Sequence, residues 1–190
     1  MPSVLSDEQI CSNALAMLGQ GPITDLAGTN PHAIMCNSIY ASTRDALLEE
    51  HAWGFATKRV ALAVSTTTPE SGYDYQFALP ADCLRVLDAD TTGTHYVTEY
   101  GYLLANVDEI TIRYITRVTE PGRFSPTFGE ALACRIASKL AMPILKKSSA
   151  VQMAEALFDR SIKIAKRCDA AQDNPTPPTE TEQSTWLAAR

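Results

Sequence analysis

Apolar residues recur every three or four positions in four segments of the chain, which is the period of an amphipathic helix. Ser6, Asn30 and Ser125 stand just before three of these segments, where a side-chain oxygen can cap a helix. Proline follows Asn30 and Ser125 directly, at the first helical position. We therefore expect two helices before residue 57 and two after residue 118. Their predicted apolar faces comprise Ile10, Cys11, Ala14, Leu15 and Leu18; Cys36, Ile39, Tyr40, Thr43 and Leu47; Phe128, Leu132, Arg135, Ile136 and Lys139; and Val151, Ala154, Phe158, Ile162, Ala165 and Asp169.

Glycine and proline indicate where these helices end. Gly19 follows the first apolar face, and glycine commonly stands just past the last helical turn. The second helix is expected to end near Trp53, before Gly54. Pro143 is expected to kink or end the third helix, because proline lacks the N–H that a helix interior uses.

Between residues 57 and 118 the apolar period falls to two, which predicts strands. Alternation is clearest within 57–64 and within 110–115, and Pro80 separates two short strands between them. Turns are expected at Thr92-Gly93, at Tyr100-Gly101 and over 106–108. This block is therefore predicted to be a small antiparallel sheet or a partial barrel.

The resulting fold class is α+β: a helical bundle with an inserted small antiparallel β-domain and an extended C-terminal tail. The helical domain comprises residues 1–56 and 119–172, the inserted β-domain 57–118, and the tail 173–190. The tail is rich in Pro, Thr and Glu, and its apolar content is too low for it to fold alone.

The charge balance limits the partners that the chain can bind. Its formal net charge is −6, whereas a free-standing nucleic-acid binding protein usually carries a basic excess that neutralises phosphates. Tight binding to DNA or to an anionic membrane surface is therefore disfavoured. The sequence shows no apolar run of the roughly 18 residues that a membrane helix needs, and no signal peptide.

Candidate catalytic and metal-binding residues are few. The five cysteines lack a CxxC pair and are predicted to be buried apolar residues in a reducing compartment. The three histidines are too scattered for a zinc site, so no cofactor is expected. His51 precedes an aromatic pair and is predicted to be structural. A hydrolase built from Cys83 and His95 stays open as an alternative, although no nucleophile motif supports it.

The C-terminal tail carries a different kind of candidate. Trp186 and Leu187 lie in an otherwise polar, proline-rich segment that ends in Arg190. Tryptophan is a common anchor of protein interfaces, so this pair is a candidate docking element for another chain.

Five stretches in this order carry a resemblance to a known family: "NALAMLGQGPITDL", "LLEEHAWGFATKRVAL", "FALPADCLRVL", "YVTEYGYLLANVDEITIRYI" and "FGEALACRIASKLAMPI". Together they resemble tail tubular protein A of short-tailed bacteriophages, the head-to-tail adaptor. The likeness spans about residues 10–171. It rests on the order of the stretches, since no single motif is specific.

The resemblance implies a structural virion protein of the phage tail that is not an enzyme. It implies a dodecameric ring between the portal protein and the tail nozzle, tail tubular protein B, with tail fibres as possible further partners. DNA would pass through the lumen without specific binding. Trp186, Leu187 and Arg190 would then dock on the portal, while Trp53, Gly54 and Phe55 would anchor the seam between helices and β-insert. The alternative is a small hydrolase or ligand-binding module that uses the β-insert.

Overall fold

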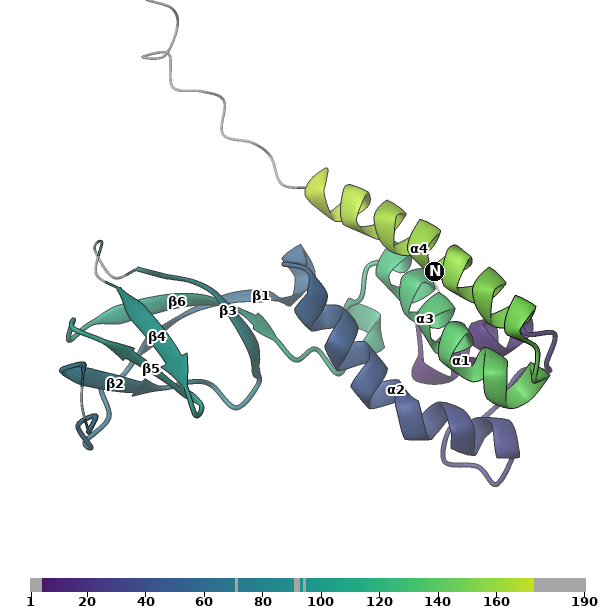
Figure 1. Cartoon of the computed structure of the whole chain (residues 1–190), viewed down its shortest axis with the longest axis horizontal. Coiled ribbons are helices and arrows are strands. Elements are labelled where there is room, and N and C mark those ends of the chain that lie inside the picture. The colour runs from purple at the N-terminus through teal and green to yellow at the C-terminus, as the bar shows by residue number, and fades with distance from the viewer. Residues whose placement is uncertain (1–4, 71, 91–92, 94, 173–190) are drawn as a thin grey trace, which may run out of the picture.

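The computed structural model describes residues 5–70, 72–90, 93 and 95–172. Within these residues the chain forms four helices and two three-stranded antiparallel sheets, so the predicted α+β class is confirmed. The helices gather on one side of an elongated molecule and the sheets on the other (Figure 1). The tail predicted for 173–190 lies outside the described residues.

The four helices are α1 (Asp7–Met17), α2 (Pro31–Glu50), α3 (Pro126–Leu145) and α4 (Ser148–Ala170). Two short 3₁₀ turns, η1 (Gly54–Ala56) and η2 (Pro121–Arg123), lie at the two crossings between the helices and the sheets. The three predicted caps form: Ser6, Asn30 and Ser125 each accept a hydrogen bond from a backbone N–H of the first turn. These oxygens satisfy donors that have no partner inside the helix.

The end of the second helix differs from the prediction, and the third helix ends close to the predicted place. The second helix ends at Glu50 rather than near Trp53, and His51 is already extended. The end comes early because the indole N–H of Trp53 turns back and binds the carbonyl of Leu47 in the last turn of α2. Pro143 lies inside the last turn of α3, which continues for two more residues and ends at a left-handed Lys146.

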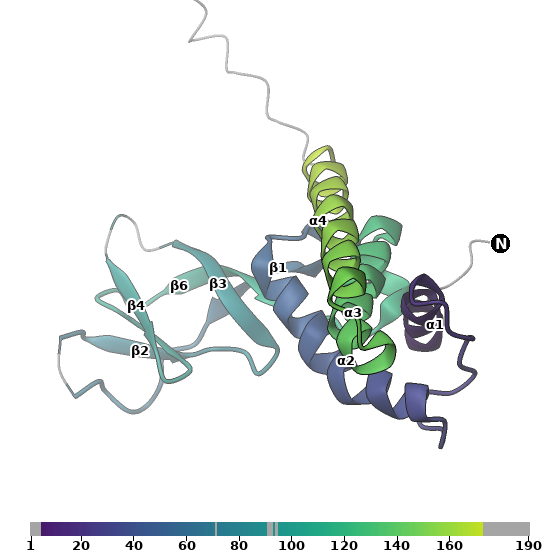
Figure 2. The same ribbon diagram turned by 45° about the vertical axis from the view of Figure 1, so that its right-hand side comes forward.

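Helix α3 is the centre of the helical part and contacts each of the other three helices. Figure 2 shows α4 lying along α3, with α1 and α2 on other sides of it. The four predicted apolar faces meet in one core, although Arg135 and Lys139 stay at its edge. Burial of these faces supplies most of the driving force for packing the bundle.

The strands are β1 (Thr57–Leu62), β2 (Tyr75–Ala78), β3 (Cys83–Asp90), β4 (Tyr96–Glu99), β5 (Tyr102–Ala105) and β6 (Ile110–Thr116). They pair in the orders β1-β6-β3 and β2-β5-β4, and an isolated bridge between Val64 and Phe77 links the two sheets. Phe77 and Leu103 of one sheet share a core with Ile110 and Ile112 of the other. The β-insert, predicted as a small antiparallel sheet or a partial barrel, therefore consists of two antiparallel sheets packed on a common core.

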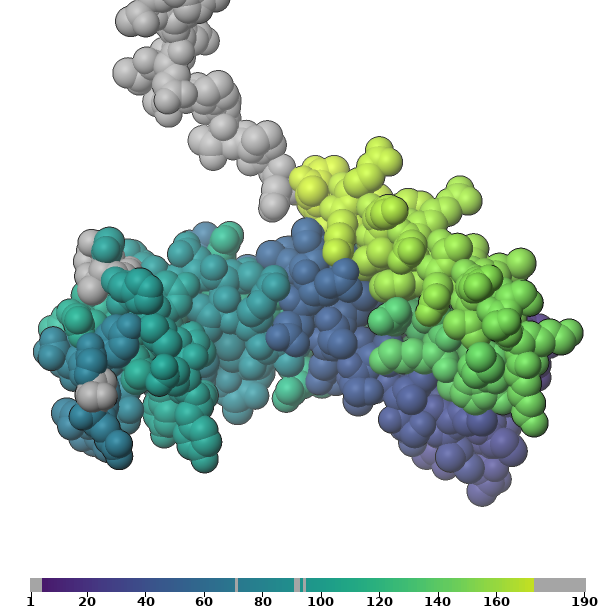
Figure 3. All heavy atoms as spheres, in the orientation of Figure 1, coloured from purple at the N-terminus to yellow at the C-terminus, as the bar shows by residue number. Residues whose placement is uncertain are grey.

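The sheet β1-β6-β3 also reaches the helical core. Tyr114 faces the core between the sheets, whereas Ile115, its neighbour on the opposite face of β6, is buried among the helices. Side chains alternate between the two faces of a strand, so Ile115 lies on the face opposite Ile110 and Ile112, and the helices cover that face at this end of β6. An ion pair between Asp45 of α2 and Arg117, 2.9 Å apart, spans the same junction. The space-filling view shows the two parts in direct contact there (Figure 3).

Candidate functional site

The seam, residues 53–55, lies between the end of α2 and the start of β1. The side chain of Trp53 is completely buried, and its indole nitrogen donates to the carbonyl of Leu47 at 3.0 Å. Phe128 of α3 packs edge-on against both aromatic residues of the seam, with ring centroids 5.0 Å from Trp53 and 5.1 Å from Phe55. Edge-to-face aromatic pairs at such distances stabilise a fold by more than the burial of their apolar area alone. The seam is thus an aromatic cluster that fixes the exit of the chain from the helices.

Asp169 at the end of α4 closes this cluster from the other side. Its carboxylate is buried and accepts the backbone N–H of Gly54, at 3.1 Å and 3.3 Å to its two oxygens. The imidazole Nε2 of His51 lies 3.3 Å from the same carboxylate, a partner that the sequence did not indicate. The sequence reasoning placed Asp169 on the core face of α4 and missed this contact.

Gly54 does not depend on the conformational freedom of glycine. Its φ angle is not in the left-handed region. A Cβ at this position would meet the Asp169 carboxylate oxygen at 3.6 Å, which is an ordinary contact. Gly54 contributes its backbone N–H, which donates to the Asp169 carboxylate.

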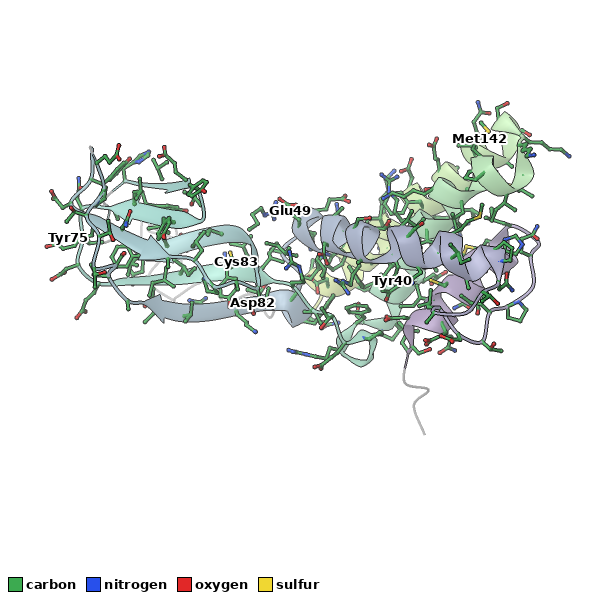
Figure 4. All side chains as sticks on the ribbon, turned by 90° about the horizontal axis from the view of Figure 1, so that it is seen from below. Tyr40, Glu49, Tyr75, Asp82, Cys83 and Met142 are labelled. Atoms are coloured by element: carbon green, nitrogen blue, oxygen red, sulfur yellow. The ribbon has the colours of Figure 1, made fainter. Side chains whose placement is uncertain are left out.

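Asp82 ties together the sheet β1-β6-β3 at the end that meets the helices, where Figure 4 labels it beside Cys83. Its carboxylate accepts hydrogen bonds from Thr116 at 2.6 Å, Lys58 at 3.0 Å and Tyr114 at 3.2 Å. The hydrogen bond from Thr116, followed by the bond and charge of Lys58, holds the pKa of Asp82 below its usual range. No motif in the sequence marked this residue as a junction.

The predicted docking residues Trp186, Leu187 and Arg190 lie outside the described residues, so the structure leaves their role as a prediction. The described chain ends at residue 172, just past α4. Two exposed surfaces of the described residues are candidates for contact with other chains, one on α4 and one on the sheets.

The first surface is a shallow apolar groove along α4, which we call the α4 groove. Its volume is about 320 Å³ at the centre, and it continues at both ends into smaller or more open hollows. The side chains of Leu157 and Ile164 are each 44% exposed there. Large apolar side chains gathered on one open surface are typical of contact sites. The central groove is lined by Met17, Glu130, Cys134, Leu157, Arg160, Ser161 and Ile164.

The second surface is the turn between β4 and β5, which we call the hairpin tip, Tyr100 and Gly101. Both residues have positive φ angles, 48° and 81°, as the tight two-residue turn requires. Glycine adopts that conformation readily, but for a bulky residue such as tyrosine it is a strained outlier. The side chain of Tyr100 is 99% exposed. An open hollow beside it, about 360 Å³, is lined by Pro69, Glu70, Gln76, Glu99, Tyr100, Tyr102 and Leu104.

The residues considered for catalysis do not come together in the described part of the chain. Burial and the charge of Asp82 raise the pKa of the Cys83 thiol, which opposes formation of a nucleophilic thiolate. His95 contacts the hydroxyl of Tyr73 at 3.5 Å instead. No cluster of His, Cys, Asp and Glu among the described residues could hold a metal ion.

The cysteines follow the prediction in part. Cys11, Cys36 and Cys134 are buried, as expected of small apolar residues. Cys83 is half-buried, and Cys168 is exposed because it lies on the outer face of α4. Burial of all five was therefore wrong for Cys168, which shares an exposed face of α4 with Ile164.

No helix in the described part of the chain combines the length and the apolar character that a membrane crossing requires. No protein-family model matches the chain, and no curated protein matches it either. Neither comparison assigns the chain to a family.

Proposed function

We propose that this chain is a structural virion protein, a ring-forming adaptor that joins the portal of a short-tailed phage to the tail nozzle. The observation that carries the proposal is the ordered string of sequence stretches that resemble this family. Three of those stretches contact one another: Phe128 packs against Trp53 and Phe55 of the seam, and Asp82 accepts a hydrogen bond from Lys58, three residues beyond it. The resemblance therefore includes residues that link the helices to the sheets.

This junction suits a protein that transmits force between two partners. Trp53 and Asp169 hold the helical part to the root of the β-insert through buried aromatic and charged contacts. A rigid junction lets one part bind the portal and the other the nozzle without loss of alignment. The net charge of −6 would give DNA a lumen along which it slides without adhering.

Attachment to the portal is assigned to residues 176–190, with Trp186 and Leu187 entering an apolar pocket and Arg190 at the end. The prolines of this segment favour an extended arm that spans a long distance for its length. Ordering one short peptide costs much of its binding energy, so affinity would come from many arms acting together in a ring.

Electron microscopy of the purified chain mixed with the portal ring from the same genome tests the proposal. We expect an added ring of density on one face of the portal. A truncation lacking residues 186–190 should keep its helical circular dichroism and its melting temperature but lose the added density. Normal attachment of that truncation would refute the role of the arm, and absence of density for the intact chain would refute the adaptor.

One observation favours a second candidate, a ligand-binding module. The hollow beside the hairpin tip, at about 360 Å³, falls within the size range of small-molecule sites. Saturable binding of a small molecule, lost on Tyr102→Ala, together with indifference to portal protein, would favour this candidate over the adaptor.

A further inference from the structure

The hairpin tip has the features of a docking element rather than of a loop that merely reverses the chain. Tyr100 occupies a strained turn position that glycine or asparagine would fill at lower cost, and its side chain is 99% exposed in the part of the chain that the structure describes. Tyrosine is among the residues that most often anchor interfaces. The carboxylates of Glu70 and Glu99 line the hollow beside it, and among the described residues neither forms an ion pair.

The α4 groove has the complementary character. Its floor is apolar, with Leu157 and Ile164 both partly exposed. Arg160 lines its centre and Arg167 lines the hollow at its end, and neither guanidinium is ion-paired within the described part of the chain. The groove lining also holds one carboxylate, Glu130, so Arg160 and Arg167 leave it with a positive excess. An apolar floor with such an excess fits an aromatic side chain flanked by carboxylates.

One chain cannot bring these two surfaces together. Helix α4 runs along the upper edge of the helical part, whereas the turn between β4 and β5 lies at the lower edge of the sheets (Figure 1), and Figure 2 shows the same separation. The aromatic and buried polar contacts at the seam hold the two parts in this arrangement. The occupant of the groove must therefore come from another molecule.

We infer that the hairpin tip of one copy docks in the α4 groove of a second copy, with Tyr100 against Leu157 and Ile164. Such a contact is heterologous, since it joins two different surfaces, and repeating it builds a ring if the rotation closes and a filament if it does not. Closure into a ring rests on the function proposed above, whereas the tip-in-groove contact does not. Glu99 and Glu70 would then face Arg160 and Arg167.

Site-specific crosslinking tests the contact on the full chain. With Tyr100 replaced by the photoreactive p-benzoyl-phenylalanine, illumination should give a covalent dimer, and mass spectrometry should place the link in residues 153–164 of the other copy. Leu157→Glu should lower the dimer yield at least about tenfold, because it puts an unpaired carboxylate into the apolar contact. Leu157 is partly exposed, so the fold should survive, which circular dichroism can check. Ile34→Glu, on α2 and 56% exposed, is the matched control and should change nothing. Links elsewhere, or none, would overturn the inference.

Mixing two variants tests the heterologous geometry. Chains carrying Tyr100→Ala keep a working groove, and chains carrying Leu157→Glu keep a working tip. In sedimentation velocity each variant alone should remain monomeric, whereas the equimolar mixture should form dimers that grow no further. A mixture that stays monomeric while the wild-type chain associates would contradict the contact.

The same crosslinking applied to chains attached to portal rings separates this inference from the proposed function. Portal attachment without a link from position 100 to α4 would leave the adaptor standing and remove the tip-in-groove contact. A link without portal attachment would leave the tip-in-groove contact standing and remove the adaptor.

Discussion

Three neighbouring residues contact the indole of Trp53. His51 and Phe128 pack against it with centroids 4.8 Å and 5.0 Å away, and the nitrogen donates to Leu47. A fully buried side chain with this many partners leaves both a cavity and an unsatisfied carbonyl when it is removed. Trp53 is therefore the residue at which a single change should do the most damage to the fold.

We expect Trp53→Ala to lower the free energy of unfolding by about 3–5 kcal/mol. Urea titration followed by circular dichroism measures this loss. Met153→Ala, on the exposed face of α4, is the control and should change it by less than about 0.5 kcal/mol. A loss near zero for Trp53→Ala would rule out a structural role for the seam.

Residue identity alone could not reveal the partner of Gly54. Asp169 lies 115 positions away, and the N–H that it binds belongs to the backbone, which every residue except proline carries. The sequence placed Trp53 and Phe55 at a boundary because the apolar period changes there, and the resemblance implied that they anchor the seam. It could not say which distant carboxylate would complete it.

At the scale of elements, Asp82 joins β1, β6 and the segment before β3 through three side-chain hydrogen bonds. Because the folded state lowers the pKa of this carboxyl, its ionised form stabilises the fold. That stabilisation is complete above the ordinary carboxyl pKa and is lost as the pH falls through the lowered value. Acid should therefore weaken the attachment of β1 and β3 to β6.

Comparison of the wild-type chain with Asp82→Asn across pH tests whether ionisation of Asp82 stabilises the fold. At pH 7 the variant should be less stable by under about 1 kcal/mol, since the carboxylate is partly exposed and water screens it. The gap should begin to shrink as the pH falls below about 4, where the carboxyl of the unfolded chain takes up a proton, and it should close as the pH falls through the lowered pKa of the folded state. Thermal unfolding at each pH measures it, with Asp108→Asn as an exposed control. A gap that widens in acid would contradict the assignment.

Elements were predictable where local chemistry determines them. Helix caps, the two prolines at first helical positions and the period-two strands depend on neighbouring residues, and the structure confirms them. The predicted end of α2 was wrong because a side-chain hydrogen bond, from Trp53 to the carbonyl of Leu47, ends the helix. The apolar period of the sequence does not indicate such a bond. Division of the strands into two sheets depends on pairing between strands far apart in sequence, such as β1 with β6.

For the whole molecule, the two parts should unfold together. Ile115 of β6 is fully buried in the helical core, and Leu84 and Leu87 of β3 pack against the same core. Unfolding of either part would therefore expose apolar surface of the other. Scanning calorimetry should show one transition whose calorimetric and van't Hoff enthalpies agree, and helical and tyrosine signals should melt at the same temperature. Two resolved transitions would show that the parts are independent.

The sequence by itself determined the α+β class, the order of helices and strands, the capped starts of three helices and the apolar faces that pack. These features depend on interactions between residues close in sequence and on the period of apolar residues, which can be read along the chain. Only the tertiary structure decided which carboxylates hold the seam, that the strands form two sheets, and that Leu157 and Ile164 are left open beside Arg160 while Tyr100 extends from the opposite edge. Those features depend on which distant residues meet and which faces remain uncovered, and that is settled only when the whole chain packs.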